Sequence, residues 1–532
     1  MVRFSFPAAL LLSLLFFAAG FVFIRQVGVQ QDEVLFTTAV VPPFEYHYAI
    51  ELRGRPFTAM IMPYLGTLKA HLLNKVFAVW PADVFAIRIP MMALSAVTLL
   101  LYWAIFRLAL GHLVALLVVG LLALDPLYVL TSTLDWGPVV LQRFLFAAGL
   151  LALVVYHRRQ SWWLLALAGF VFGLGVWDKA TFFWLLGAYS FAAFLVYPAL
   201  VVVPFTFRRL GILVLAGALG GAPFVYYNFH RPAETLAWTP QSEALPYSQR
   251  AVIMKRTLDG SALFDYLTRQ DAAPAPPART RVEAAGVGLS GLTGHLHQHL
   301  LFPALFGAVA VALWRRRTIY ARAIFFAALA LLSGWLVMFA FAMGGQGSHH
   351  MVLLWPLPHL IVACALGELA QRRRWIALTA ATVIAGSEAL VTNEYYAQIV
   401  RNGPQDYWTT AAEPLRAYLA EAAPNGIYPL EWGIMGPLRA LGRGTLPIGF
   451  PPEWLDAGSE FRPQDRAALE HLLTVVNPYF VRYVDRTGRS NAAVERLVAR
   501  SAELGFREHP LATIPDRHGR PMYLVTQFRP NP

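Results

Sequence analysis

The sequence predicts a polytopic α-helical membrane protein of about eleven transmembrane helices with a C-terminal soluble α/β domain. Three observations lead to this prediction. Apolar segments long enough to cross a bilayer recur along the first 392 residues. Only 14% of the residues are charged and 57% are hydrophobic, a balance that soluble domains do not have. From residue 393 onward the composition becomes polar.

The apolar segments and the basic residues between them define the predicted topology. Lys and Arg near the end of a membrane helix favour the cytoplasmic side. One threading of the chain places every short basic cluster inside, so we expect a cytoplasmic N-terminus and an outer C-terminal domain. The predicted helices are 4–24, 84–106, 112–130, 138–156, 162–177, 181–203, 210–228, 299–314, 319–342, 349–369 and 375–392. The clusters are His157-Arg158-Arg159, Arg208-Arg209, Arg315-Arg316-Arg317 and Arg372-Arg373-Arg374.

These clusters account for much of the formal net charge of +12. The charge therefore indicates contact with a lipid bilayer, and we expect no nucleic-acid partner. The single cysteine, Cys364, excludes a disulfide within the chain and a cysteine-based zinc site.

The threading leaves two long loops, 25–83 and 229–298, outside the membrane together with the end of the chain. Residues 479–484 alternate in polarity as a strand does, and Pro-Asn-Gly and Gly-Arg-Gly mark turns nearby. We therefore predict a transmembrane catalytic domain over 1–392, which includes both loops. We predict an extracytoplasmic soluble α/β domain over 393–532.

Four carboxylates are expected at the outer ends of helices. Asp32 and Glu33 follow the first predicted helix by about eight residues, which suggests chemistry at the membrane surface, although most loop carboxylates are only solvated. Asp125 precedes a proline and can simply shape a turn. Asp135 lies just before Pro138, which suits the first turn of a helix, so an N-cap role is as plausible as a functional one.

Basic residues near the same surface are candidates to bind a phosphate. Lys69 lies in a segment whose apolar residues have helical spacing, typical of a helix lying on the outer leaflet, and it is the favoured phosphate contact. Arg88 begins the next helix and can alternatively only extend to the interface. Arg143 lies about two turns inside an apolar helix, where we expect an ion pair with Asp135 or Asp178.

His349 and His350 begin a predicted helix at the outer face. Adjacent residues of a helix point about 100° apart, so this pair is poorly placed to share a metal ion. His295, His297 and His299 alternate along the chain and have equally poor spacing if helical. The sequence therefore predicts no metal site and no cofactor, although a divalent metal is left open, and it favours phosphate contacts for the first pair.

In order, spacing and membrane side, these segments resemble the bacterial GT-C glycosyltransferases of the protein-mannosyltransferase and lipid A aminoarabinose-transferase type, a family 39-like group. The resemblance covers about residues 1–370. It departs from the group at Ile61-Met62-Pro63, where Lys-Pro-Pro is frequent, and at His349-His350, where Arg-Tyr is usual. The residues that carry it are Asp32-Glu33, Pro63-Tyr64-Leu65, Arg88-Ile89-Pro90, Asp135, the run from Gly173 to Ala180, and the segment from His350 to Pro358.

The resemblance implies a bacterial inner-membrane enzyme that takes a sugar from a polyprenyl-phosphate donor. The acceptor would be an extracytoplasmic lipid, glycan or protein, and transfer would proceed with inversion. A phosphate leaving group needs cations rather than a general acid. The candidate cations are Lys69, Arg88, Lys179, His349 and His350.

The acceptor hydroxyl needs a general base, and Asp32 is the candidate within the Asp32-Glu33 pair. Asp135 is expected to orient the base or the acceptor. The expected supporting residues are Asp125, Arg143 and Asp178.

Two other classes of protein remain open from the sequence. A lipid-sugar transporter would place its ionisable residues near the bilayer midplane, on broken helices within repeats. Here the acidic residues collect at one face, which favours an enzyme. A non-catalytic scaffold that presents the outer domain would leave Asp32, Asp135 and Arg143 without a shared role.

Overall fold

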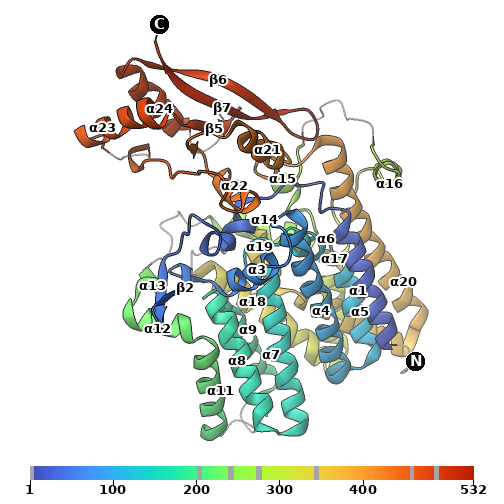
Figure 1. Cartoon of the computed structure of the whole chain (residues 1–532). Helices are drawn as coiled ribbons and strands as arrows, with labels where there is room; N and C mark the ends of the chain where they lie inside the picture. The colour runs from blue at the N-terminus through green and yellow to red at the C-terminus, as the bar shows by residue number, and fades with distance from the viewer. Residues whose placement is uncertain are drawn as a thin grey trace.

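The computed structural model describes residues 5–199, 206–237, 245–270, 278–340, 347–455, 460–484 and 491–531. Most of these residues are helical, and two small sheets lie outside the main helical bundle. Figure 1 shows the C-terminal sheet with its helices stacked on one end of the bundle, while the chain begins near the opposite end.

The bundle consists of apolar helices. Among the described residues, four of them (α4, α7, α18 and α20) are long and apolar enough to cross a membrane, or six if each of two bent pairs is one span. The ends of the helices predicted over 181–203 and 319–342 lie outside the described residues. The helices are α1 (Ser5–Phe21), α4 (Val84–Leu110), α5 (His112–Leu124), α6 (Pro126–Thr133), α7 (Val139–Arg159), α8 (Trp162–Asp178), α9 (Phe182–Val196), α11 (Phe207–Gly220), α12 (Ala222–His230), α17 (Leu301–Trp314), α18 (Ile319–Ala340) and α20 (Leu357–Asn402).

Three of the predicted helices are interrupted near prolines, which cannot donate a backbone hydrogen bond to the preceding turn. The third predicted helix bends by 63° between α5 and α6, where Pro126 opens the new helix. The seventh bends by 79° between α11 and α12, near Pro223. The helix predicted over 349–369 is continuous only from Leu357, just after Pro356.

Helix α20 contains two helical halves in one 46-residue element. Arg373 interrupts it with non-helical dihedral angles, φ −138° and ψ 69°. This break falls in a basic cluster predicted to be a cytoplasmic turn, and it separates the last two predicted membrane helices. The second half continues past the predicted domain boundary at residue 393 to Asn402, so that boundary stays a prediction.

Small residues allow α8 and α11 to pack closely. A side chain at Gly173 would overlap the backbone carbonyl of Gly217, and one at Gly220 would overlap that of Phe170. Close backbone approach through small residues is the usual way in which membrane helices associate. The glycine-rich run that begins at Gly173 therefore has a structural reason in addition to its resemblance to a family motif.

The loops predicted to lie outside the membrane fold into short elements at the end of the bundle that faces the C-terminal sheet (Figure 1). The first loop forms an antiparallel sheet in the order β1-β2-β3, followed by the amphipathic helix α3. The elements are α2 (Gln31–Val34), the 3₁₀ helix η2 (Leu35–Ala39), β1 (Tyr48–Leu52), β2 (Arg55–Met62), β3 (Leu65–Gly66), α3 (Leu68–Phe77), α13 (Glu234–Ala237), α14 (Tyr247–Leu258), α15 (Phe264–Leu267), α16 (Arg281–Leu292), α19 (Ser348–Met351) and η3 (Val352–Leu354).

The C-terminal region forms a four-stranded sheet in the order β4-β5-β7-β6, in which β4 and β5 are parallel and the other pairs antiparallel. The strand expected at 479–484 is β5, and it lies within this sheet. The elements are η4 (Asp406–Trp408), α21 (Ala412–Ala422), β4 (Ile427–Pro429), α22 (Met435–Gly442), η5 (Glu453–Leu455), α23 (Pro463–His471), the π-helical turn η6 (Leu472–Val476), β5 (Tyr479–Tyr483), α24 (Asn491–Glu503), β6 (Phe506–Pro515) and β7 (Pro521–Pro530).

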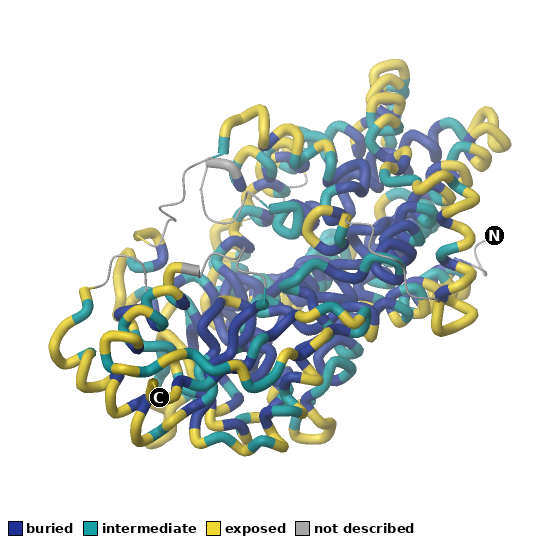
Figure 2. Tube along the Cα trace, turned by 90° about the horizontal axis from the view of Figure 1, so that it is seen from above, coloured by how far each residue is buried: buried dark blue, intermediate teal, exposed yellow. Residues whose placement is uncertain are grey.

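Buried residues concentrate in the interior of the bundle, and exposed residues line its outside (Figure 2). Large apolar side chains such as Leu11 on α1, Phe191 on α9 and Leu215 on α11 are exposed on the outside. Apolar surface of this extent is what a bilayer would cover. The C-terminal region packs onto the bundle through polar contacts, including a 2.6 Å ion pair between Arg439 and Glu45.

Candidate active site

Asp32 lies in the first turn of α2, directly after the first bundle helix. The Gln30 side chain caps this turn by accepting a hydrogen bond from the Asp32 amide at 2.6 Å, and Glu33 completes the capping box. The cap therefore fixes the direction of two adjacent carboxylates. Asp32 is partly exposed, whereas Glu33 is completely buried.

Glu33 and Arg88 form a closed ion pair. Arg88 donates to both carboxylate oxygens of Glu33, at 2.6 and 2.8 Å. Its remaining donors reach the backbone carbonyls of Ile24, Val27 and Gly28. Both side chains are 0% exposed. The pair joins the end of the first bundle segment to α4, and neither member has the freedom that the predicted roles in catalysis and phosphate binding require.

Lys69 and Asp135 form a second buried pair. The Nζ of Lys69 lies 2.6 Å from Asp135 Oδ2 and donates to the Gly137 carbonyl, also at 2.6 Å. Asp135 has a positive φ of 26° and accepts from the Val140 amide at 3.2 Å. The N-cap of α7 is Pro138, three residues after Asp135. Asp135 therefore binds an amide in the first turn of α7 without occupying the N-cap position. The Lys69 ammonium is thus already held by Asp135 and Gly137, and its role as the main phosphate contact stays a prediction.

Lys179 lies between α8 and α9 and contacts the first outer loop. The Ala180 amide donates to the Tyr64 carbonyl at 2.9 Å, and Leu65 pairs with Lys179 as a β-bridge. The Lys179 ammonium lies over the Tyr64 ring, 5.8 Å from its centre. In the described part of the chain, this ammonium has no hydrogen bond or ion pair, in contrast to Lys69.

Asp32 and Lys179 influence one another electrostatically. Burial lowers the pKa of Lys179 to about 8, and the carboxylates of Asp32 and Asp178 oppose that change. Burial raises the pKa of Asp32, while its hydrogen bond with Gln30 and the charge of Lys179 act in the other direction. A lysine ammonium and a carboxylate therefore share one partly enclosed region without forming a closed pair.

The two adjacent histidines lie next to this region. His349 stacks on Trp136, with ring centres 5.8 Å apart, and contacts His350 at 4.0 Å. The Lys179 charge acts on both imidazoles. The charge of Lys179, at the α8–α9 junction, therefore acts on Asp32 from α2 and on His349 and His350 from α19.

The predicted supporting residues occupy different places. Asp178 is buried at the end of α8, close enough to Lys69 and Asp135 for their charges to act on it. Arg143 is not paired with Asp135 or Asp178 among the described residues. Its guanidinium donates to Ser132 at 2.9 Å and lies over the Tyr128 ring at 4.4 Å.

Asp125 lies apart from the candidate active site. It is the N-cap of α6 and accepts from the Tyr128 amide at 2.7 Å. Its neighbours include His359 and Glu388, neither of which is among the site residues predicted from the sequence. Both are ionisable residues inside long apolar helices, and that feature alone marks a residue for attention.

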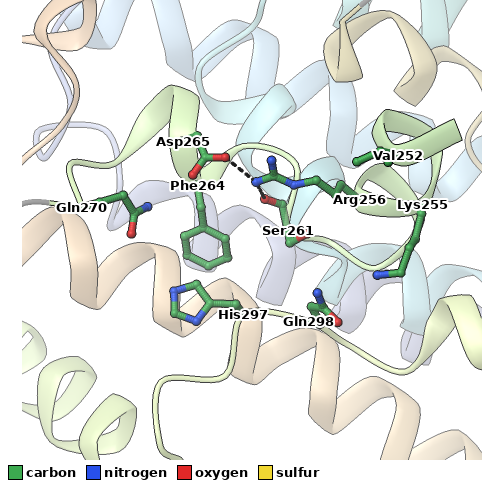
Figure 3. A pocket seen from close by; sticks show the side chains of 9 residues that line it. All are labelled: Val252, Lys255, Arg256, Ser261, Phe264, Asp265, Gln270, His297 and Gln298. Carbon is green, nitrogen blue, oxygen red and sulfur yellow. Dashed lines mark hydrogen bonds and ion pairs between the residues drawn. The ribbon is translucent and has the colours of Figure 1, made fainter. Parts of the chain in front are cut away.

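A pocket of about 430 Å³ opens among α14, α15 and the segment before α17 (Figure 3). Lys255 and Arg256 line it but already pair with Asp259 and Asp265, at 2.7 and 2.6 Å. Its α15 side borders the candidate active site, because Tyr266 packs on Trp136 with ring centres 5.0 Å apart. The pocket has a mixed polar and apolar lining, and both of its lining cations among the described residues are already paired.

Comparison with known proteins agrees with the family resemblance. Residues 63–226 match the family described as dolichyl-phosphate-mannose-protein mannosyltransferase. No curated sequence matches the chain at a significant level. The crystal structure of ArnT from Cupriavidus metallidurans bound to undecaprenyl phosphate is 11% identical, with 98% of this chain and 97% of that chain covered and a TM-score of 0.59.

The oligosaccharyltransferase from Archaeoglobus fulgidus in its apo form is 13% identical, with 92% of this chain and 71% of that chain covered and a TM-score of 0.50. These similarities confirm the predicted resemblance to the GT-C glycosyltransferases at the level of the fold, and with it the polytopic helical architecture. The number of membrane crossings and the role of each site residue stay predictions.

Proposed function

We propose that this protein is a membrane glycosyltransferase that transfers a sugar from a polyprenyl-phosphate donor to an acceptor hydroxyl outside the cytoplasm. The observation that carries the proposal is a partly exposed carboxylate, Asp32, under the charge of Lys179, a cation that forms no hydrogen bond or ion pair within the described residues. A fold shared with ArnT, whose crystal structure contains undecaprenyl phosphate, supports the donor class.

Lys179 supplies the charge that the departing phosphate needs. When the bond between the sugar anomeric carbon and the phosphate oxygen breaks, the electron pair stays on that oxygen, and polyprenyl phosphate leaves as an anion. An ammonium in a partly water-excluded site stabilises this charge more strongly than one in water. His349 and His350, whose rings touch and on which the Lys179 charge acts, are the candidates to donate hydrogen bonds to the same group.

Asp32 acts as the general base in this scheme. Its carboxylate accepts the proton of the acceptor hydroxyl while the hydroxyl oxygen forms the new bond to the anomeric carbon. A single displacement of this kind inverts the configuration at that carbon. The Gln30 cap orients the carboxylate for the reaction and leaves its side chain partly exposed to an entering acceptor.

The two buried pairs position the site without taking part in the chemistry. Lys69 and Asp135 hold the turn that carries Trp136 and Gly137, and His349 stacks on Trp136. Glu33 and Arg88 anchor the helical turn that carries Asp32. Loss of either ion pair would therefore affect the active site indirectly, because the segments that carry Trp136 or Asp32 would be displaced.

We further propose a cytoplasmic N-terminus and an outer location for the active site and the C-terminal region. The motive is the agreement of the basic clusters with one threading. A reporter fused after Arg317 should indicate the cytoplasm, and one fused after Pro532 should indicate the exterior. A cytoplasmic signal from the C-terminal fusion contradicts the assignment of the site to the outer face.

One alternative function has an observation in its favour. Asp125, His359 and Glu388 form an ionisable cluster inside the bundle, and transporters also place ionisable residues within their helical bundles.

The decisive experiment is an in vitro assay of purified protein in lipid nanodiscs, with a panel of polyprenyl-phosphate sugars and an envelope extract as acceptor. Sugar transfer that depends on Asp32 supports an enzyme. Flipping of the labelled lipid in proteoliposomes without transfer supports a transporter.

A further inference from the structure

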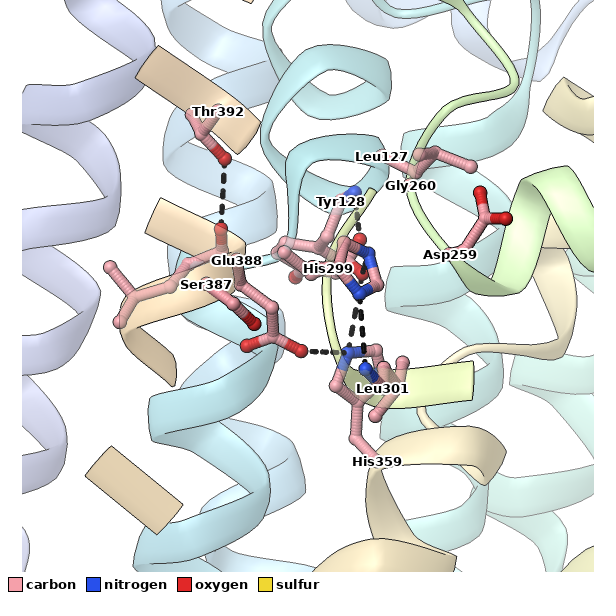
Figure 4. A network of polar contacts seen from close by, with 12 residues as sticks. Leu127, Tyr128, Asp259, Gly260, His299, Leu301, His359, Ser387, Glu388 and Thr392 are labelled. Carbon is pink, nitrogen blue, oxygen red and sulfur yellow. Dashed lines mark hydrogen bonds and ion pairs between the residues drawn. The ribbon is translucent and has the colours of Figure 1, made fainter. Parts of the chain in front are cut away.

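A second cluster of ionisable side chains lies inside the bundle, away from Asp32 and Lys179. Asp125 comes from the α5–α6 junction, His359 from the first half of α20 and Glu388 from its second half. Figure 4 shows His359 and Glu388 directed toward one another, with His299 beside them. Asp125, His359 and Glu388 are each 0% exposed.

The distances in this cluster fit the ligands of one small cation. His359 Nε2 lies 3.4 Å from Asp125 Oδ2 and 3.7 Å from Glu388 Oε1. One ligand atom from each residue lies within 4.8 Å of the others. In a tetrahedral zinc site with bonds of about 2.0–2.1 Å, two ligand atoms are about 3.3–3.4 Å apart. The His359–Asp125 distance already has this value, and the pairs that involve Glu388 would have to contract, from 3.7 Å and from at most 4.8 Å.

Within the described residues, most polar atoms of the cluster make no hydrogen bond and have as ionic neighbours only each other and His299. Asp125 Oδ2, both oxygens of Glu388 and both ring nitrogens of His359 have no hydrogen bond. Two carboxylates buried together with only imidazoles beside them are very unfavourable. A divalent cation would balance the two negative charges, and it would give the three inward atoms their missing contacts.

The second carboxylate oxygen of Asp125, Oδ1, accepts hydrogen bonds from the protein, as the non-coordinating oxygen of a metal-binding carboxylate often does. Asp125 Oδ1 accepts from the Tyr128 amide at 2.7 Å and from Trp355 Nε1 at 3.1 Å. These bonds orient Oδ2 toward His359. His299 adds a further neighbour, because its Nε2 lies 3.8 Å from Asp125 Oδ2. Such surrounding hydrogen bonds commonly orient metal ligands.

We propose that Asp125, His359 and Glu388 bind a structural divalent transition-metal ion, with Zn²⁺ favoured by the mixed nitrogen and oxygen ligands and the tetrahedral spacing. The ion joins the two halves of α20, which are separated by the break at Arg373, to the α5–α6 junction. Trp355 connects this centre to the segment that carries His349 and His350. The proposal does not depend on the transfer reaction.

The test is the metal content and thermal stability of the full-length protein, purified through a non-histidine tag in metal-free buffer. We expect about one zinc ion per chain by plasma mass spectrometry. Chelation should lower the thermal midpoint by more than about 5 °C, and zinc chloride should restore it. Folded wild-type protein with no stoichiometric metal and no response to chelator or zinc would overturn the proposal.

Two variants and a matched control locate the ion. His359→Gln and Glu388→Gln should lose the zinc, whereas His230→Gln, which changes an exposed histidine on α12, should keep it. The direction of the change in thermal midpoint caused by Glu388→Gln also distinguishes a bound metal from a metal-free buried carboxylate. It lowers the thermal midpoint if a metal is lost, but raises it if it merely removes an unpartnered buried carboxylate. A raised midpoint, or unchanged zinc in both cluster variants, contradicts the site.

Discussion

Asp32 and Glu33 are adjacent in the sequence and share one helical turn, yet their environments are opposite. Glu33 is enclosed and bonded through both oxygens to Arg88, which also satisfies three backbone carbonyls. Asp32 is partly exposed. Burial raises its pKa and the charge of Lys179 acts to lower it, although the two side chains do not form a closed ion pair.

The difference separates structure from chemistry. A buried ion pair with complete hydrogen bonds has no capacity left for a substrate, and breaking it leaves a charge in an apolar interior. A carboxylate and an ammonium that still lack strong partners can accept a proton and an anion from a ligand. The four predictions that follow test this comparison between the closed Glu33–Arg88 pair and the open Asp32–Lys179 site.

The largest effect on activity is expected from Asp32→Asn. The substitution keeps the shape of the side chain but removes the base, so the transfer rate should fall on the order of 100- to 10,000-fold. Thermal stability and yield should remain close to wild type. Glu51→Gln, at an exposed carboxylate of the same outer loop, is the matched control and should retain activity. Normal transfer by well-folded Asp32→Asn protein would remove Asp32 from the mechanism.

The next effect is on stability rather than on catalysis. Glu33→Gln leaves the Arg88 guanidinium buried without its counter-charge, which should cost about 3–5 kcal/mol of unfolding free energy. Thermal unfolding in detergent measures the loss as a lower midpoint and a lower yield. A Glu33→Gln protein that is as stable as wild type but inactive would instead place Glu33 among the reacting groups.

Lys179→Gln should weaken the use of donor without unfolding the protein. A hydrogen bond to a charged group contributes about 1.5–3 kcal/mol, so kcat/KM for the donor should fall by about 10- to 150-fold. Lys75→Gln, at an exposed lysine on α3, is the control with the same chemical change. Equal kcat/KM values in the two variants would show that Lys179 does not contact the donor phosphate.

The smallest expected effect is a shift in the pH profile of kcat/KM. Activity requires ionised Asp32, whose pKa is raised, so the acidic limb should lie above the usual aspartate value of 3.8. Activity also requires protonated Lys179, so it should decline as the pH rises through about 8. In kcat this alkaline limb should move to higher pH, because the bound phosphate stabilises the ammonium.

Lys179→Arg tests the assignment of that limb. An arginine stays charged across the accessible pH range, so the decline near pH 8 should disappear even if the variant is slower. An alkaline limb that persists unchanged in Lys179→Arg belongs to another group.

The candidate site was only partly predictable from the sequence. Asp32 could be selected because it follows an apolar helix on the outer side, and Lys179 because it resembles a family motif. Lys69 and Arg88 have the same residue types and similar positions, but their partners, Asp135 and Glu33, come from other elements. Sequence spacing alone contains no information on which cation a distant carboxylate has already neutralised.

The polytopic helical architecture was determined by the sequence itself, because an apolar run without charge can satisfy its backbone in a bilayer only as a helix. Proline also ended or bent helices where its missing N–H requires it. Only the tertiary structure decided which ionisable residues meet. In the folded chain, Glu33 pairs with Arg88, whereas Lys179 and Asp32 influence one another without an ion pair. His359 and Glu388 lie close together although the break in α20 separates them in the sequence. Those outcomes depend on packing between distant segments, since burial and the geometry of several elements together set which charge each group can reach.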